Sequence, residues 1–145
     1  MSWSGRKCLF ALLGLICLSF ANFPAGPAFS ASNAGNVPEL AVEKQSPEYI
    51  WVLRTPGKAG VVQVILTLRD AAGKTVKGRR VTGEVLMPTM PMPGYPLELE
   101  FQEAEDGKYA ALVQYGHGGY WQIKARFKDD KDQLFQQVFD LDIKD

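Results

Sequence analysis

The residues of the 145-residue chain best suited to chemistry are concentrated in one segment, residues 85–96. This segment holds three of the four methionines and four of the nine prolines. Proline lacks a backbone N–H and fixes φ, so the segment is neither a helix nor a central strand. We expect an exposed loop on an extended or polyproline-like path, which holds flexible thioethers near solvent. The segment therefore indicates either binding of a soft metal or contact with a partner protein.

A histidine side chain is a candidate further ligand beside these thioethers. His117 is the only histidine, and it lies in a glycine-rich turn. Met90 and Met92 are two residues apart, so on an extended chain they point to the same side, whereas Met87 is in phase with the preceding strand and is expected to enter the core. Thioether and imidazole ligands suit Cu(I), and the scarcity of carboxylates argues against Ca²⁺ or Mg²⁺. The predicted site has Met90 and Met92 as ligands, His117 as the third and Met87 as support.

A metal-free explanation of the same residues remains open. The methionines would then cap the open end of a sandwich, and the glycines around His117 would serve only to permit positive φ. In this interpretation a rigid, proline-rich rim is presented to an envelope or membrane protein partner. The rim residues are Pro88, Pro91, Pro93 and Tyr95.

No catalytic site is indicated. A single histidine in a glycine-rich turn, without a Gly-x-Ser-x-Gly motif, gives no support for a nucleophile and its base. No glycine-rich loop opens a helix to cradle phosphate. We expect a non-catalytic protein with no cofactor other than Cu(I).

The N-terminal residues indicate export. Arg6 and Lys7 precede an apolar run over residues 8–21, and small residues with prolines follow. We therefore predict a signal peptide over residues 1–30, cleaved after Ala21 or after Ser30. The apolar run is shorter than the roughly 20 residues that span a bilayer, which makes a retained N-terminal anchor the less favoured alternative. Cleavage would remove both cysteines. We therefore expect a periplasmic or secreted protein without direct membrane binding. The zero net charge of the chain gives no support for binding of nucleic acid.

The remaining sequence predicts strands. Residues 31–47 are polar and without a period, and we expect a flexible leader before a domain at residues 48–145. From there apolar and polar residues alternate in about seven short runs separated by turn residues, which is typical of an immunoglobulin-like, two-sheet antiparallel sandwich. Successive connections of such a fold lie at alternate ends. The turn at 116–119 is therefore expected at the same end as the methionine segment, together with the turn at 55–58.

Three short motifs resemble those of the YtkA-like/FixH-like group of small exported bacterial domains. They are Met87-Pro88-x-Met90-x-Met92, Asp106-Gly107-Lys108-Tyr109 and Gly119-Tyr120-Trp121-Gln122-Ile123. The resemblance covers roughly residues 48–143. It implies an immunoglobulin-like sandwich in the cell envelope, in a group where some members are associated with assembly of copper-requiring oxidases or are fused to metal-efflux adaptors.

The same resemblance assigns positions within the motifs. Met87, Met90 and Met92 match the methionine segment of the group, and Trp121 matches its core tryptophan. His117 has no fixed counterpart in the group. FixH-type members usually keep a membrane anchor longer than the apolar run of this chain.

Overall fold

The computed structural model describes residues 37–145, and this part of the chain is all-β. Its strands are β1 (Glu39–Gln45), β2 (Tyr49–Pro56), β3 (Gly60–Asp70), β4 (Val81–Leu86), β5 (Leu97–Glu103), β6 (Lys108–Tyr115), β7 (Gly119–Lys128) and β8 (Leu134–Ile143). The helical structure within residues 37–145 is one 3₁₀ turn, η1 (Glu105–Gly107). No helix in this range is long and apolar enough to cross a membrane.

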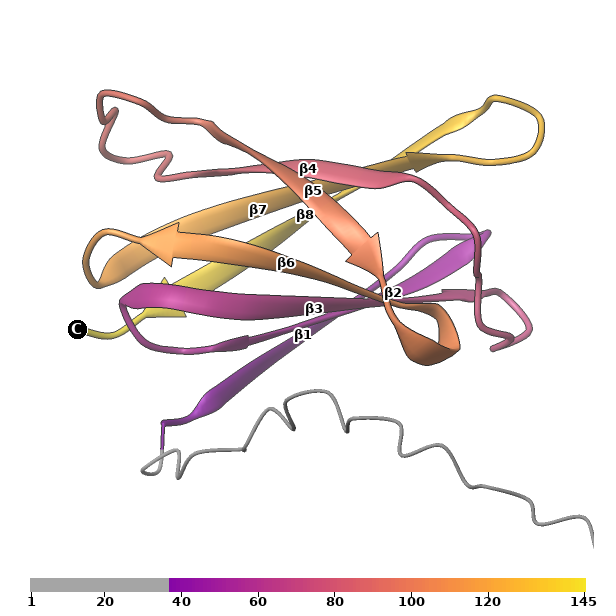
Figure 1. Ribbon diagram of the computed structural model, residues 1–145, viewed down its shortest axis with the longest axis horizontal. Coiled ribbons are helices and arrows are strands. Elements are labelled where there is room, and N and C mark those ends of the chain that lie inside the picture. The colour runs from indigo at the N-terminus through magenta and orange to yellow at the C-terminus, as the bar shows by residue number, and fades with distance from the viewer. Residues whose placement is uncertain (1–36) are drawn as a thin grey trace, which may run out of the picture. The chain divides into compact units, whose positions relative to one another are not determined.

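The strands form one antiparallel series that bends into two layers (Figure 1). The order is β1-β2-β3-β6-β5-β4-β7-β8. Strand β5 pairs with β4 over residues 97–101 and with β6 at residues 102 and 103, so it crosses from one layer to the other. The predicted all-β antiparallel class is confirmed. The two layers are joined through β5, so the eight strands form one continuous series.

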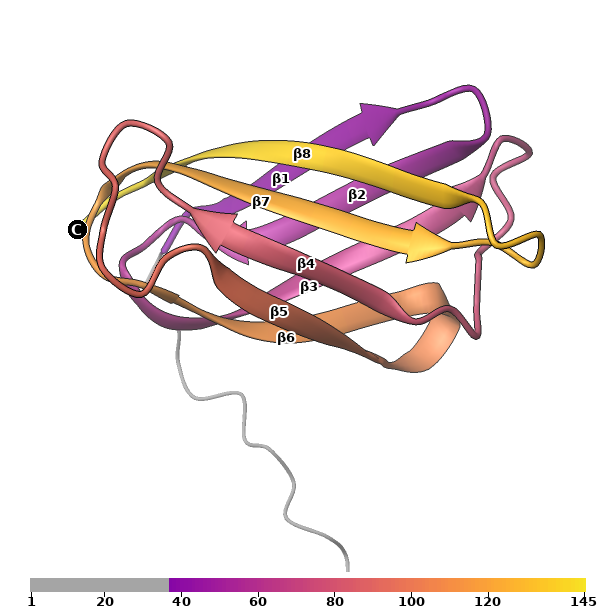
Figure 2. The same cartoon turned by 90° about the horizontal axis from the view of Figure 1, so that it is seen from above.

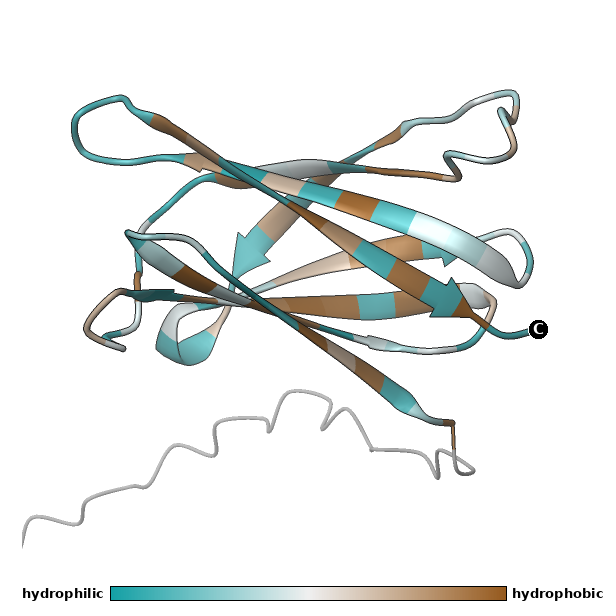
Figure 3. Ribbon diagram, turned by 180° about the vertical axis from the view of Figure 1, so that it is seen from behind, coloured by the Kyte–Doolittle hydropathy of each residue, from teal (hydrophilic) through white to brown (hydrophobic). Residues whose placement is uncertain are grey.

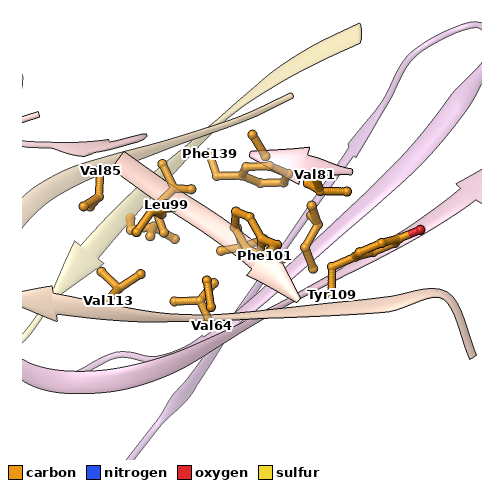
Figure 4. Packing of buried hydrophobic residues seen from close by; sticks show 14 of the residues in the cluster. Val64, Val81, Val85, Leu99, Phe101, Tyr109, Val113 and Phe139 are labelled. Atoms are coloured by element: carbon orange, nitrogen blue, oxygen red, sulfur yellow. The ribbon is translucent and has the colours of Figure 1, made fainter. Parts of the chain in front are cut away.

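The core lies between the two layers and follows from the alternation of the strands. Figure 3 shows apolar and polar residues alternating along the strands. In Figure 4, Val85, Leu99 and Phe101 face side chains of the opposite layer. The largest fully buried side chains include Trp51, Trp121, Tyr109, Tyr115, Phe127 and Phe139. Burial of each large apolar side chain stabilises the fold by roughly 1.5–3 kcal/mol.

The first strand corrects the predicted leader. Residues 39–45 form β1 and pair with β2 along their whole length, so the prediction of a flexible leader over residues 31–47 is wrong for this stretch. No residue of β1 is fully buried; Leu40 and Val42 are half-buried against the core. A strand of this kind lacks the strong apolar alternation on which the prediction relied. The predicted signal peptide lies outside the described residues.

The hairpin between β5 and β6 agrees with its sequence. Asp106 has φ 56° and ψ 40°, and Gly107 has φ 67°. Two consecutive left-handed residues are what an Asp-Gly turn between antiparallel strands requires. This turn sends β6 back toward the end of the molecule where β4 finishes.

Candidate functional site

The loop between β4 and β5 shares one end of the molecule with two other connections (Figure 2). Leu86, the last residue of β4, pairs with Gln122 near the start of β7, so the loop at 87–96 and the turn at 116–118 adjoin. Gly60 at the start of β3 pairs with Tyr115 at the end of β6, which brings in the connection between β2 and β3. The shared end predicted from the strand count is confirmed, and we call it the methionine end.

The loop itself consists of two β-turns. The amide of Met90 donates to the carbonyl oxygen of Met87 (3.3 Å), and the amide of Tyr95 donates to that of Met92 (3.2 Å). Each turn has proline at its second position, and Gly94 at the third position of the second turn has φ 82°. This is the pattern of a type II turn. The expected extended or polyproline-like path is therefore wrong, although the loop is exposed as predicted.

The three thioethers differ in their surroundings. Met87 is 7% exposed and belongs to the core, as predicted, while Met92 is half-buried against the core and Met90 is 51% exposed. Met90 and Met92 would share one side only on an extended chain, and the two turns replace such a path. Met87 and Met92 instead line one depression of about 240 Å³. Its lining residues are Leu86, Met87, Pro88, Pro91, Met92, Tyr95 and Pro96.

His117 is not among the residues that line this depression. Its Nδ1 is 2.6 Å from the carbonyl oxygen of Gly118. Because a carbonyl can only accept, Nδ1 carries the proton, and in the neutral ring Nε2 keeps the lone pair that a metal would need. The imidazole ring lies 6.1 Å from the ring of Trp121, measured between centroids.

Trp121 joins the loop to the histidine turn. Its Nε1–H donates to the carbonyl oxygen of His117 (3.0 Å), and its ring lies 5.5 Å from that of Tyr95 and 5.3 Å from that of Tyr115. The hydroxyl of Tyr95 donates to the carbonyl oxygen of Gln114 (3.1 Å). The sequence assigned Trp121 to the core alone. Its position four residues after His117, at the start of a strand, is the signal that its indole reaches back to the turn.

Met87 makes a second connection between the same elements. A Cβ placed on Gly119 would lie 2.9 Å from Cε of Met87, so the methyl end of Met87 packs under the first residue of β7. Gly119 also has φ 137°, which favours glycine. The thioether of Met87 thus reaches from the loop to the edge of the histidine turn.

A buried tyrosine at this end of the molecule is neutral. Tyr115 is 1% exposed, and burial raises its pKa to about 12 although the hydrogen bond with Thr55 lowers it. Its hydroxyl is 3.4 Å from Thr55 Oγ1. No three His, Cys, Asp or Glu side chains within residues 37–145 are grouped as a metal site would need. A metal at the methionine end would therefore depend on thioethers and one imidazole.

Together these features define a small all-β domain with a methionine-bearing end. The family model described as YtkA-like matches residues 43–126. Because this is more than half of the chain, the chain belongs to the YtkA-like family. The match begins in β1, ends in β7 and includes the methionine loop, His117 and Trp121. Neither a curated protein nor a solved structure matches the chain.

Proposed function

We propose that this protein is an exported, non-catalytic accessory domain of the cell envelope that binds or relays Cu(I) at its methionine end. The observation that carries the proposal is that the side chains of Met87 and Met92 line the same depression. Thioethers are soft ligands, and Cu(I) is the soft ion that prefers them. The N-terminal sequence pattern supports export to the periplasm or beyond.

The donors proposed here differ in part from the pair expected from sequence. Met87 and Met92 are the thioether ligands, and His117 is the third ligand through Nε2. Met90 stands outside the depression and is 51% exposed. We assign it to first contact with an incoming ion, since an exposed flexible thioether reaches solvent without opening the core.

A Cu(I) titration in competition with a chromogenic chelator tests the assignment. Purified protein is expected to take up about one Cu(I). Met87→Leu combined with Met92→Leu abolishes this uptake, because leucine replaces the thioether by an apolar side chain of similar volume. Such exchanges usually cost less than about 1.5 kcal/mol of stability, so the fold is retained.

Met90→Leu is the matched control, and it is expected to retain the stoichiometry. Uptake that survives the double substitution contradicts the proposal. Loss of uptake in Met90→Leu alone would contradict the depression as the site and favour the pair expected from sequence.

The apolar lining supports a second candidate, a metal-free interaction module. Four of the five lining residues other than the methionines are Pro88, Pro91, Pro96 and Tyr95, which present a stiff rim to an envelope or membrane protein partner. Docking of this kind depends on shape and apolar contact, so it survives the two Met→Leu substitutions and is lost on Tyr95→Ser. A pull-down compares the envelope proteins captured by the unmodified protein and by the Met87→Leu, Met92→Leu variant, each with and without copper. Capture that the double substitution leaves unchanged supports the interaction module.

A further inference from the structure

A second depression, of about 300 Å³, lies on the outer face of β4, β7 and β8. Its lining residues are Arg80, Thr82, Arg126, Phe127, Lys128 and Leu134. Each of its charged side chains is a cation. The β7–β8 turn nearby is at the opposite end of the molecule from the loop at 87–96 (Figure 1), so this cationic pocket is separate from the methionine end.

The register of the sheet holds these side chains together. Thr82 on β4 is the direct partner of Arg126 on β7, and Lys128 is the direct partner of Leu134 on β8. Arg126 and Lys128 are two residues apart, so they share one face of β7. Arg80 lies two residues before Thr82, immediately before the start of β4. Arg126 and Lys128 are therefore positioned by strand pairing and not by a loose surface loop.

Arg126 has unused capacity to bind an anion. Its Nε donates to Thr82 Oγ1 (3.4 Å), and within residues 37–145 it makes no ion pair. The hydroxyl of Thr82 accepts this bond and keeps its own hydrogen to donate. The terminal nitrogens of the guanidinium remain as a planar pair of donors, the geometry that recognises phosphate by two parallel hydrogen bonds.

The other two cations are paired only at the surface. Arg80 Nη2 lies 3.4 Å from Glu100 Oε1, and Lys128 Nζ lies 2.9 Å from Asp132 Oδ1. All four of these side chains are more than half exposed. Exposed pairs of this kind contribute little to stability, so a multiply charged anion can replace the carboxylates.

An adjoining depression of about 330 Å³ indicates on which side the anion would lie. It shares Arg80, Thr82 and Arg126 with the cationic pocket, but its lining also contains Glu98 and Glu100. Carboxylates repel an anion, whereas the cationic pocket is lined by none. Leu134, which is 55% exposed, adds an apolar wall.

We propose that the cationic pocket binds a phosphate group. Arg126 is its bidentate hydrogen-bond donor and Thr82 a neutral donor. Arg80 and Lys128 supply flanking positive charges. The same chemistry is offered by the headgroup of an anionic phospholipid and by a free phosphate. The proposal does not depend on copper binding, because the two sites share no residue.

The test titrates purified, ¹⁵N-labelled protein with inorganic phosphate at constant ionic strength and follows the backbone amide signals. Signals of Thr82, Arg126 and Lys128 shift in a saturable way. Arg126→Gln raises the apparent dissociation constant about tenfold, as expected for loss of a charge-assisted hydrogen bond. The matched control is Arg54→Gln, which removes an exposed arginine from β2 in the other layer.

A second arm measures co-sedimentation with phosphatidylcholine vesicles that contain or lack phosphatidic acid. Sedimentation that requires phosphatidic acid and Arg126 identifies the lipid headgroup as the source. Saturable phosphate shifts without such sedimentation identify a free phosphate. The proposal is overturned when neither response depends on Arg126, or when Arg54→Gln weakens both as much as Arg126→Gln does.

Discussion

The indole Nε1–H of Trp121 donates a hydrogen bond of 3.0 Å to the carbonyl oxygen of His117. Trp121 is fully buried, and its ring also contacts Tyr95 from the methionine loop. One core side chain therefore holds both the histidine turn and the loop, which are far apart in sequence. The geometry of the methionine end depends on this core residue as much as on Met87, Met92 and His117, the proposed ligands.

Replacing Trp121 by phenylalanine is expected to loosen the histidine turn. The change removes the indole N–H and leaves the carbonyl of His117 without its partner, at a cost of about 1–3 kcal/mol. Amide hydrogen exchange of Gly118 and Gly119 is expected to accelerate. Trp51→Phe is the control, because Trp51 is equally buried but packs on Phe127, away from the turn. Equal acceleration in both variants would show that lost volume, and not the hydrogen bond, governs the turn.

Most of the fold could be predicted from alternation. In β3 the residues Val64, Leu66 and Leu68 alternate with half-buried or exposed ones, and β7 does the same, so burial on one face was evident in both. Strand β1 could not be predicted in this way, because its half-buried residues pack at the margin of the core. A marginal strand is stabilised by pairing with its neighbour more than by burial, and pairing leaves little trace in a single sequence.

The site was predictable in location and not in detail. The strand count placed the methionine loop and His117 at one end, since chain direction alternates in an antiparallel fold. The conformation of the loop was misjudged. Pro93-Gly94 is a signature of a type II turn, but the run of prolines favoured an extended path in the sequence analysis. The pairing of Met90 with Met92 was argued from that extended path.

A glycine in β4 gives a prediction about the close packing of two strands. A Cβ on Gly83 would lie 2.3 Å from the backbone carbonyl oxygen of Lys124 on β7, so Gly83→Ala must push the strands apart. We expect a loss of about 1–3 kcal/mol in the free energy of unfolding, measured by urea denaturation. Alanine normally stabilises a strand interior relative to glycine, so the sign itself is informative.

Gly116→Ala provides the comparison for this measurement. Nothing lies within 4 Å of a Cβ placed on Gly116, and we expect a change within about 0.5 kcal/mol. Equal stability of the two variants would contradict the close approach of β4 and β7.

The buried hydroxyl of Tyr115 predicts a loss of stability at alkaline pH. Its pKa in the folded protein is raised to about 12 from 10.0, so the unfolded chain loses this proton first. The stabilisation is complete below pH 10 and is lost as the pH rises toward 12, by roughly 2–3 kcal/mol in all. Urea denaturation at about pH 9 and about pH 11.5 measures the difference.

Tyr115→Phe removes the titrating group and keeps the ring against Trp121. The variant is less stable at neutral pH, because Thr55 Oγ1 loses the hydrogen bond with Tyr115 and keeps only the one to the carbonyl oxygen of Pro56, and its stability changes less between the two alkaline conditions. An unchanged alkaline loss in the variant would assign the effect to other groups. Tyr49, Tyr109 and Tyr120 also have raised pKa values, so a smaller dependence is expected to remain.

The proposed role of His117 as a ligand can be separated from its packing. His117→Phe keeps an aromatic ring beside Trp121 but removes both nitrogens, whereas His117→Ala removes the ring as well. If Nε2 binds Cu(I), both variants lower the affinity for Cu(I) by at least about tenfold in the competition titration, because each lacks the donor nitrogen. If the ring only supports the turn, His117→Phe binds as tightly as the unmodified protein and His117→Ala does not. Thermal unfolding of both variants, measured without copper, gives the packing contribution independently, so the difference in copper affinity can be assigned to the nitrogen.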